Sequence, residues 1–225
     1  MNCFDDNVEQ SKTLAARLAS DISDYLNHQQ RVSLCLPGGT TPGPVFDELS
    51  RVELDWRRVD VLLSDERWVS VNSPLSNEAL LRDRLACNAA SEVQIVSYYD
   101  QADTIRDATL VFNQKIEQFM PLDICVLGMG LDGHFASLFT DMEKLEEALD
   151  LNAENALVLV DARSQPMMRV SLNLTTLAGA KKQYLLVRGE DKKMVLETVK
   201  DSMSQTLPVS YLFAQCPEIE VYYAG

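Results

Sequence analysis

The segment GMGLDGH at residues 128–134 carries His134, one of only two histidines in the chain. An imidazole titrates near neutral pH, so His134 can take a proton from water and later return one to a leaving group. Glycines let the backbone approach a ligand closely, and Asp132 is placed either to orient the imidazole or to bind sugar hydroxyls. The pattern alone fits a histidine that caps a helix equally well. The other histidine, His28, lies among Asn and Gln residues and is expected to be solvated.

A second segment, PGGTTP at residues 37–42, follows an apolar run and contains four small or polar residues, Gly38, Gly39, Thr40 and Thr41. A turn of this kind between a strand and a helix presents free backbone amides, which favour an anion. It matches neither GxxxxGK[ST] nor GxGxxG, so a nucleotide is not the expected ligand. A tight turn with threonine as a helix cap explains the same residues about as well.

Three cations stand beside other predicted strands. The segment SDER at residues 64–67 places Asp65 and Arg67 where an apolar run ends, Arg169 enters a later predicted strand, and Lys192 follows the strand after that. Arginine offers a forked donor to an oxyanion or phosphate, and a neighbouring carboxylate can fix its orientation. Each charge taken singly is typical of a solvent-exposed loop, so a functional role depends on their convergence.

Hydrophobic periodicity predicts the elements that position these residues. Apolar residues at three- and four-residue steps, together with proline at a first turn, predict helices at residues 11–25, near 42, and at 76–85, 105–119, 143–149 and 192–200. Short apolar runs predict strands at residues 32–36, 59–63, 93–96, 124–127, 157–160, 170–174, 184–187 and 219–223, with SDERW as a loop. Strands that alternate with helices predict an α/β fold of three layers, α/β/α, around an open, mainly parallel sheet. Ligands of such sheets bind beyond the carboxyl ends of the strands.

Composition limits the classes of function. A chain of 225 residues with 46% hydrophobic residues predicts a single domain over residues 1–225. The formal net charge of -14 disfavours nucleic-acid and anionic-membrane partners, so any anion site must be a local convergence of cations and amides. Five scattered cysteines without CxxC pairs predict reduced thiols and no metal site. Neither a signal peptide nor a long apolar run is evident, so a cytoplasmic location is expected.

Taken together and in order, several segments resemble the 6-phosphogluconolactonase family over most of the chain: PGGTTP, SDERWV, the Ser76-Asn77 pair, LGMGLDGHFASLF, RVSLNL and GEDK. The resemblance implies a modified Rossmann-like α/β sandwich, shared with glucosamine-6-phosphate deaminase and ribose-5-phosphate isomerase. It implies hydrolysis of 6-phosphoglucono-δ-lactone in the pentose phosphate pathway, without a metal or organic cofactor, by a monomer or small homo-oligomer. His134 becomes the general base and Arg67 an electrostatic partner. The implied substrate-binding residues are Gly38, Gly39, Thr40, Thr41, Asp65, Asp132, Arg169 and Lys192.

Three positions depart from the family pattern, and one alternative mechanism and two alternative functions remain to be weighed. Pro37 stands where a serine is common, which removes a hydroxyl contact to phosphate; the other two departures are Asn72 and Thr140. Ser137 is a candidate nucleophile, although no GxSxG elbow surrounds it. A deaminating isomerase of the same fold needs a carboxylate after the histidine, and FASLF at residues 135–139 has none. A phosphosugar-sensing module without turnover would leave His134 and Arg67 unexplained.

Overall fold

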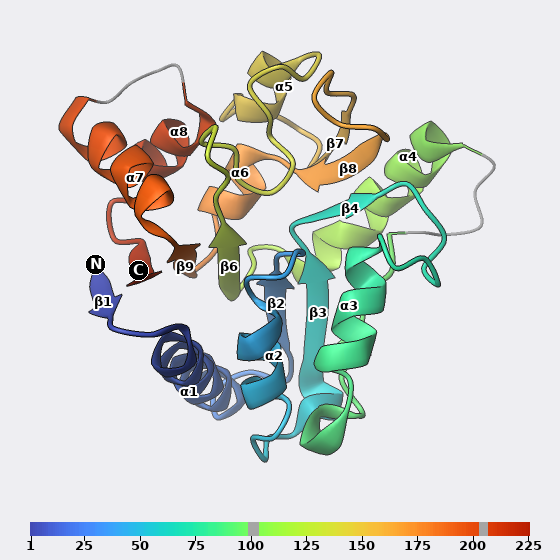
Figure 1. The fold of residues 1–225 in the computed structure, drawn as a ribbon. Coiled ribbons are helices and arrows are strands. Elements are labelled where there is room, and N and C mark those ends of the chain that lie inside the picture. Colours follow the sequence, from blue (N-terminus) through green and yellow to red (C-terminus); the bar gives the residue numbers. More distant parts are fainter. Residues whose placement is uncertain (99–103, 203–206) are drawn as a thin grey trace.

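The computed structural model describes residues 1–98, 104–202 and 207–225. A seven-stranded parallel sheet lies at its centre, with the strand order β1-β10-β9-β6-β2-β3-β5 (Figure 1). β2 and β3 are buried along their whole length, as expected for strands covered on both faces. The seven strands are β1 (Asn2–Phe4), β2 (Val32–Leu36), β3 (Val59–Leu63), β5 (Gln94–Ile95), β6 (Ile124–Gly128), β9 (Lys182–Arg188) and β10 (Glu220–Ala224).

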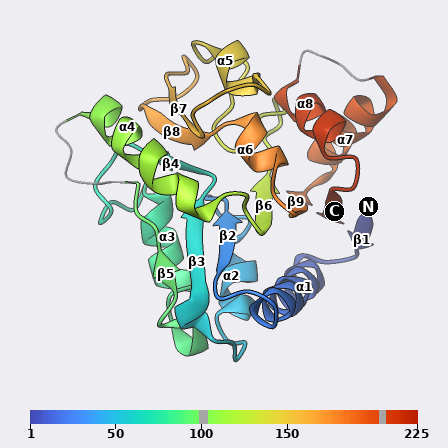
Figure 2. The same ribbon diagram turned by 180° about the vertical axis from the view of Figure 1, so that it is seen from behind.

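Helices cover both faces of this sheet, which confirms the predicted three-layer α/β fold. One face is covered by α1 (Asn7–Leu26), α2 (Gly43–Leu49) and α3 (Asn77–Arg84) (Figure 1). The opposite face carries α4 (Ile105–Ile116) and α6 (Leu174–Ala178), which stand in front in Figure 2. The other helices are α5 (Leu145–Leu149), α7 (Glu190–Ser202), α8 (Pro208–Gln215) and the 3-10 turns η1 (Trp56–Arg58), η2 (Asn88–Ala90) and η3 (Glu117–Phe119). None of the helices within the described ranges is long and apolar enough to cross a membrane.

Side-chain caps set the starts of several helices. Asp6 accepts hydrogen bonds from two backbone N–H groups in the first turn of α1, and Ser76 and Thr104 cap α3 and α4 in the same way. Asn173 caps α6. Each cap satisfies donors that the helix itself leaves unpaired. The predicted helix at residues 105–119 is α4 followed directly by η3, so its length was right although its last turn tightens.

A second sheet was not predicted. β4 (Asp65–Arg67), β8 (Arg169–Leu172) and β7 (Leu157–Val160) form a separate three-stranded antiparallel sheet in the order β4-β8-β7. The expectation of a loop at residues 65–67 was wrong, because a strand of three polar residues shows no apolar alternation. The strand predicted at 157–160 was right, and the one predicted at 170–174 was right only as far as Leu172, because Leu174 already begins α6. Hydrophobicity does not say with which strand a run pairs. β1, α6 and α8 were also missed, although Pro208 ahead of an apolar run is a signal for a helix start.

The strand order of the main sheet has a topological switch point between β2 and β6. From β2 the chain adds β3 and β5 towards one edge, and from β6 it adds β9 and β10 towards the other. Ligands of open α/β sheets bind at such a switch point, outside the carboxyl ends of the strands. The segments at residues 37–42 and 129–134 directly follow these two strands. The topology therefore brings the predicted turn and the predicted histidine loop to the same crevice.

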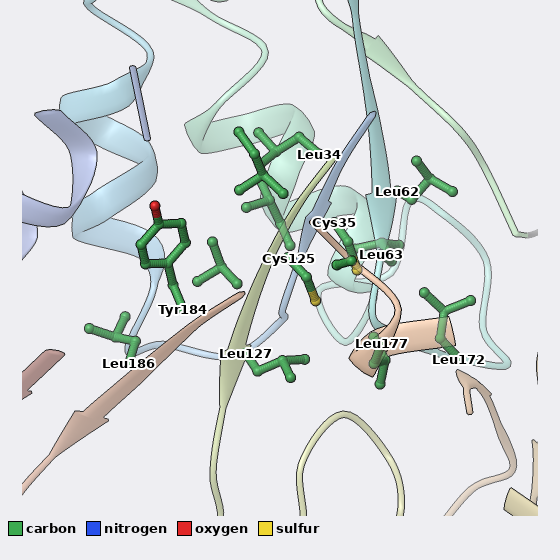
Figure 3. Close-up of a cluster of buried hydrophobic side chains, with 14 of the residues drawn as sticks. Leu34, Cys35, Leu62, Leu63, Cys125, Leu127, Leu172, Leu177, Tyr184 and Leu186 are labelled. Atoms are coloured by element: carbon green, nitrogen blue, oxygen red, sulfur yellow. The ribbon is translucent and has the colours of Figure 1, made fainter. Parts of the chain in front are cut away.

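Large apolar side chains pack these strands together in the core (Figure 3). Leu34, Leu62 and Leu127, on β2, β3 and β6, are fully buried in the same core. Truncating such a side chain to alanine typically costs about 2–5 kcal/mol, so the strands form a rigid base for the loops above them. Cys35 and Cys125 are in-register neighbours on β2 and β6, and all five cysteines are free.

Candidate active site

A cavity of about 280 Å³ lies at the carboxyl edge of the main sheet, beneath β4 and β8. Nine of the ten predicted site residues line it: residues 38–41, Asp65, Arg67, His134, Arg169 and Lys192. Other hollows are larger. Those of about 800 and 650 Å³ lie beside α4 and, like one of about 410 Å³, contain none of these residues, whereas one of about 330 Å³ contains Lys192 alone. The convergence of predicted residues, rather than size, marks the smaller cavity as the candidate active site.

The wall of this cavity is cationic although the protein is strongly acidic. Its described lining residues include three cationic side chains, Arg67, Arg169 and Lys192, and one carboxylate, that of Asp65. Burial lowers the pKa of Lys192, and burial likewise lowers the pKa of Arg169. An anion in the cavity would offset the lost hydration of both groups. The local convergence of cations that an anion site requires in a chain of net charge -14 is therefore present.

Asp132 orients the imidazole of His134. The Nδ1 atom of His134 lies 2.5 Å from Oδ1 of Asp132, and the backbone N–H of His134 donates to the same oxygen at 3.3 Å. The hydrogen bond from His134 lowers the pKa of Asp132, so this carboxylate is ionised at neutral pH. An ionised carboxylate only accepts, which assigns the proton of the neutral ring to Nδ1 and leaves Nε2 unprotonated. Asp132 is not part of the cavity wall, and its side chain contacts the imidazole of His134.

Two glycines and an aromatic ring determine where the imidazole lies. A Cβ atom on Gly130 would stand 2.2 Å from Cε1 of His134, so only glycine leaves room for the ring. Gly133 has a φ of +73°, a conformation that side chains disfavour. The imidazole also packs against Phe139, with the ring centroids 4.3 Å apart. Gly130 and Gly133 thus help to place the imidazole of His134.

A buried network fixes Arg169 in the cavity wall. The hydroxyl of Ser137 donates to Oδ2 of Asp65 at 2.5 Å, and Nη1 of Arg169 lies 3.5 Å from the same carboxylate oxygen. Nη2 of Arg169 donates to Gln165 at 2.5 Å. The side chain of Arg169 is 11% exposed, and its Nε has no hydrogen-bond partner among the described residues. The guanidinium is therefore held in a fixed orientation with a donor still unsatisfied.

Arg67 reaches the cavity because β4 pairs with β8, where Arg67 lies directly opposite Arg169. Its Nη1 donates to Oδ1 of Asn77, and the same nitrogen lies 3.3 Å from the backbone oxygen of Leu75. Asn77 is itself part of the cavity wall. No role for Asn77 was predicted beyond its place in the Ser76-Asn77 pair, because the contact depends on how β4 and α3 are placed together.

The buried carboxylate of Glu66 joins β4 to the start of α3. It accepts from the Ser76 hydroxyl at 2.9 Å and from the backbone N–H groups of Asn77 and Glu78, both at 2.8 Å. Burial raises the pKa of Glu66, and these hydrogen bonds oppose the shift. Glu66 was not among the predicted site residues, although it stands inside the SDER segment. It anchors the strand that carries Arg67.

The described part of the chain contains no group of three His, Cys, Asp or Glu side chains able to hold a metal ion. The cavity can instead combine a proton acceptor, the imidazole Nε2, with three cationic donors. Such a set can activate water, stabilise a developing oxyanion and bind a phosphate.

Comparison with known proteins identifies the family of this chain. Residues 5–221 match the family model described as glucosamine-6-phosphate isomerases/6-phosphogluconolactonase. The 6-phosphogluconolactonase of Rhizobium meliloti is 31% identical over 100% of this chain and 98% of its own length. The chain belongs to the 6-phosphogluconolactonase family. Another member, from Pseudomonas putida, is 38% identical over 84% of this chain and 80% of its own.

Solved structures agree with this family and define its fold. A 6-phosphogluconolactonase from Shewanella baltica superposes with a TM-score of 0.94 at 29% identity, covering 100% of this chain and 97% of that one. A monomeric glucosamine-6-phosphate deaminase of the NagB superfamily superposes with a TM-score of 0.78 at 20% identity, covering 100% of this chain and 97% of that one. The second likeness shows the shared fold alone.

Proposed function

We propose that this protein hydrolyses 6-phospho-D-glucono-1,5-lactone to 6-phospho-D-gluconate, a step of the oxidative pentose phosphate pathway. Its relatives named above are 6-phosphogluconolactonases. The observation that carries the proposal is one cavity that joins the oriented base, His134, to three cations, Arg67, Arg169 and Lys192. No metal or organic cofactor takes part.

The phosphate end of the substrate is bound by the more buried cations and the turn after β2. Arg169 and Lys192 supply charge, and the backbone amides of residues 38–41 supply further donors in the cavity wall. Proline at position 37 offers no hydroxyl, so the phosphate contacts from this turn come from the glycines and threonines. Because the cations lie in a partly desolvated wall, their attraction to the phosphate is strong, and the phosphate is the main source of the substrate's affinity.

The reaction takes place at the lactone carbonyl. Nε2 of His134 removes a proton from water as the water oxygen bonds to the carbonyl carbon, and Arg67 stabilises the resulting oxyanion. The bond from this carbon to the ring oxygen then breaks, and the imidazolium returns its proton to that oxygen. Asp132 stabilises the transient imidazolium and keeps the ring in the required tautomer.

A covalent route through Ser137 is disfavoured by the geometry. Its side chain is fully buried, and its hydroxyl proton is directed to Asp65 at 2.5 Å. A serine nucleophile needs its proton accepted by the catalytic base and its oxygen open to the substrate. Trapping an acyl-enzyme by mass spectrometry would contradict the direct attack of water.

The test uses freshly generated 6-phosphogluconolactone in a coupled assay, with unphosphorylated gluconolactone as the comparison. His134→Ala should lose about 10²–10⁴-fold in kcat while still binding 6-phosphogluconate, since general base assistance contributes about this much. Near-wild-type turnover in that variant would remove His134 from the role. Binding without turnover by the wild-type protein would favour a sensing module, and ammonia release from glucosamine 6-phosphate would favour the deaminase.

A further inference from the structure

Asn77 connects three parts of the candidate active site. It is the first residue of α3 and is 2% exposed. Its Oδ1 accepts a hydrogen bond from Nη1 of Arg67, and its Nδ2 donates to the backbone oxygen of Asp65 at 2.8 Å. Its backbone N–H donates to the carboxylate of Glu66, also at 2.8 Å. Both ends of the side-chain amide are therefore occupied by groups of β4.

The amide has space because residue 38 is glycine. A Cβ atom at Gly38 would stand 1.9 Å from Oδ1 and 2.0 Å from Cγ of Asn77, a distance at which one of the two must move. The turn after β2 therefore closes over the Asn77 side chain and limits its rotation. The glycine turn, β4 and α3 meet at this one amide.

An amide suits this position for an electrostatic reason. Among the described residues, Nη1 is the only guanidinium nitrogen of Arg67 with a hydrogen bond, and no carboxylate pairs with this side chain. A carboxylate at position 77 would also hold Nη1, but it would neutralise the charge that an oxyanion needs, and it could not donate to the oxygen of Asp65. An uncharged acceptor orients the guanidinium and leaves its charge intact.

We infer that Asn77 is the positioning residue for Arg67: its amide holds Nη1 through an uncharged contact, so that the other donors and the full charge of the guanidinium serve the oxyanion. This inference rests on the proposed function, because that proposal assigns Arg67 to the reacting carbonyl. Misplacement of a catalytic group by about 1 Å can cost about 10²-fold in rate, so a residue that fixes Arg67 should affect kcat more than KM.

The first experiment is a double-mutant cycle on lactone hydrolysis with Asn77→Ala, Arg67→Ala and the double variant. Asn77→Ala should lower kcat by about 10–100-fold with KM within about threefold. In the Arg67→Ala background, the same change should lower kcat by less than about twofold, because its effect passes through Arg67. Multiplicative losses in the double variant would overturn the inference.

A rescue experiment separates positioning from a general structural loss. Millimolar guanidinium chloride should restore part of the kcat of Arg67→Ala, with sodium chloride at the same concentration as the control, because the Asn77 amide offers the ion a binding point. The rescue should disappear in the double variant. Asn77→Asp should have a lower kcat than the wild type, since the carboxylate neutralises the charge of the Arg67 guanidinium. A wild-type kcat in Asn77→Asp would contradict the inference.

Asn173→Ala is the matched control for loss of a buried amide. Asn173 caps α6, is fully buried and donates to the backbone oxygen of Asn155 at 2.6 Å, away from the cavity wall. Its replacement should lower the Tm without changing kcat. If Arg67→Ala itself keeps wild-type kcat, the assignment of Arg67 fails and the role of Asn77 falls with it. A strongly impaired Arg67→Ala beside a fully active Asn77→Ala would overturn the role of Asn77 alone.

Discussion

The carboxylate of Asp132 lies 2.5 Å from Nδ1 of His134, the ring nitrogen other than the proposed proton acceptor Nε2. Because the hydrogen bond lowers the pKa of Asp132 below 3.8, the carboxylate remains ionised through the weakly acidic and neutral range. The lowered pKa stabilises the folded loop above pH 3.8, and this contribution is lost as the pH falls through the folded-state pKa. The imidazole is thus oriented at every pH at which the enzyme is expected to work.

Asp132→Asn tests this orientation with almost no change in size. The asparagine amide can donate to Nδ1, which would move the ring proton to Nε2 and block the base. We expect kcat to fall by at least about 10²-fold, with unchanged affinity for 6-phosphogluconate, because proton transfer is lost while the cations remain. Asp150→Asn, in an exposed loop, is the control and should keep wild-type kcat. An active Asp132→Asn would show that the pair has no part in turnover.

Gly130→Ala should damage catalysis through crowding alone. The added methyl would stand 2.2 Å from Cε1 of His134, so the imidazole has to leave its place beside Asp132. We expect a loss of about 10²-fold in kcat, since displacement of a reacting group has effects of this size. Gly128→Ala, at the end of β6 just before this loop, meets nothing within 4 Å and should lose less than about threefold. Equal losses in the two variants would point to general disruption of the loop.

Lys192 should make ligand affinity depend on pH. Burial lowers its pKa from 10.5, so it loses its proton at a lower pH than an ordinary lysine does. Only the protonated form attracts phosphate, and a phosphomonoester with a second pKa of about 6 is a dianion throughout the alkaline range. The affinity for 6-phosphogluconate, measured by calorimetry, should therefore fall as the pH rises towards 10.5. Lys192→Arg should show a shallower dependence, because arginine stays protonated; identical slopes would exclude Lys192 as the titrating group.

The sequence was sufficient for the parts of the site whose signals are local. An apolar run that ends in glycine marks both the turn after β2 and the loop after β6, and the switch-point rule places two such ends together. His134 and Gly39 were predicted as site residues in this way, and both line the cavity. Asp132 was predicted as well, but the sequence could not say whether its side chain contacts the imidazole or is free to bind sugar hydroxyls.

The neighbourhood of Arg67 could not be derived from the sequence. Arg67 and Arg169 face each other only through the antiparallel register of β4 and β8, and the three polar residues of β4 carry no periodic signal. Glu66 and Asn77 were missed for the same reason, since their value lies in contacts between β4 and α3. Pairings between distant segments depend on three-dimensional packing, which hydrophobic patterning specifies only in part.

Contacts at the amino ends of the strands, at the far end of the sheet from the candidate site, should affect stability without affecting turnover. Asp123, at the amino end of β6, is 5% exposed and accepts hydrogen bonds from the backbone N–H of Ser33 at 2.8 Å and from Nζ of Lys181 at 2.7 Å. The Ser33 contact joins the amino ends of β2 and β6, the two strands whose carboxyl ends lead into the candidate site, and the Lys181 contact adds the start of β9.

Asp123→Ala leaves the N–H of Ser33 buried without this acceptor, which costs about 1–3 kcal/mol, whereas Lys181 is 44% exposed and can regain water. We therefore expect the free energy of unfolding, measured by urea titration, to fall by about 2 kcal/mol. The value of kcat, measured well below the Tm, should stay unchanged, because the strands remain rigid and keep the loops at their carboxyl ends in place. Asp150→Ala, at an exposed loop, provides the baseline for both measurements. If kcat falls as well, contacts at the amino ends of the strands influence the placement of His134. That result would contradict the view that the site depends only on the loops at the carboxyl ends.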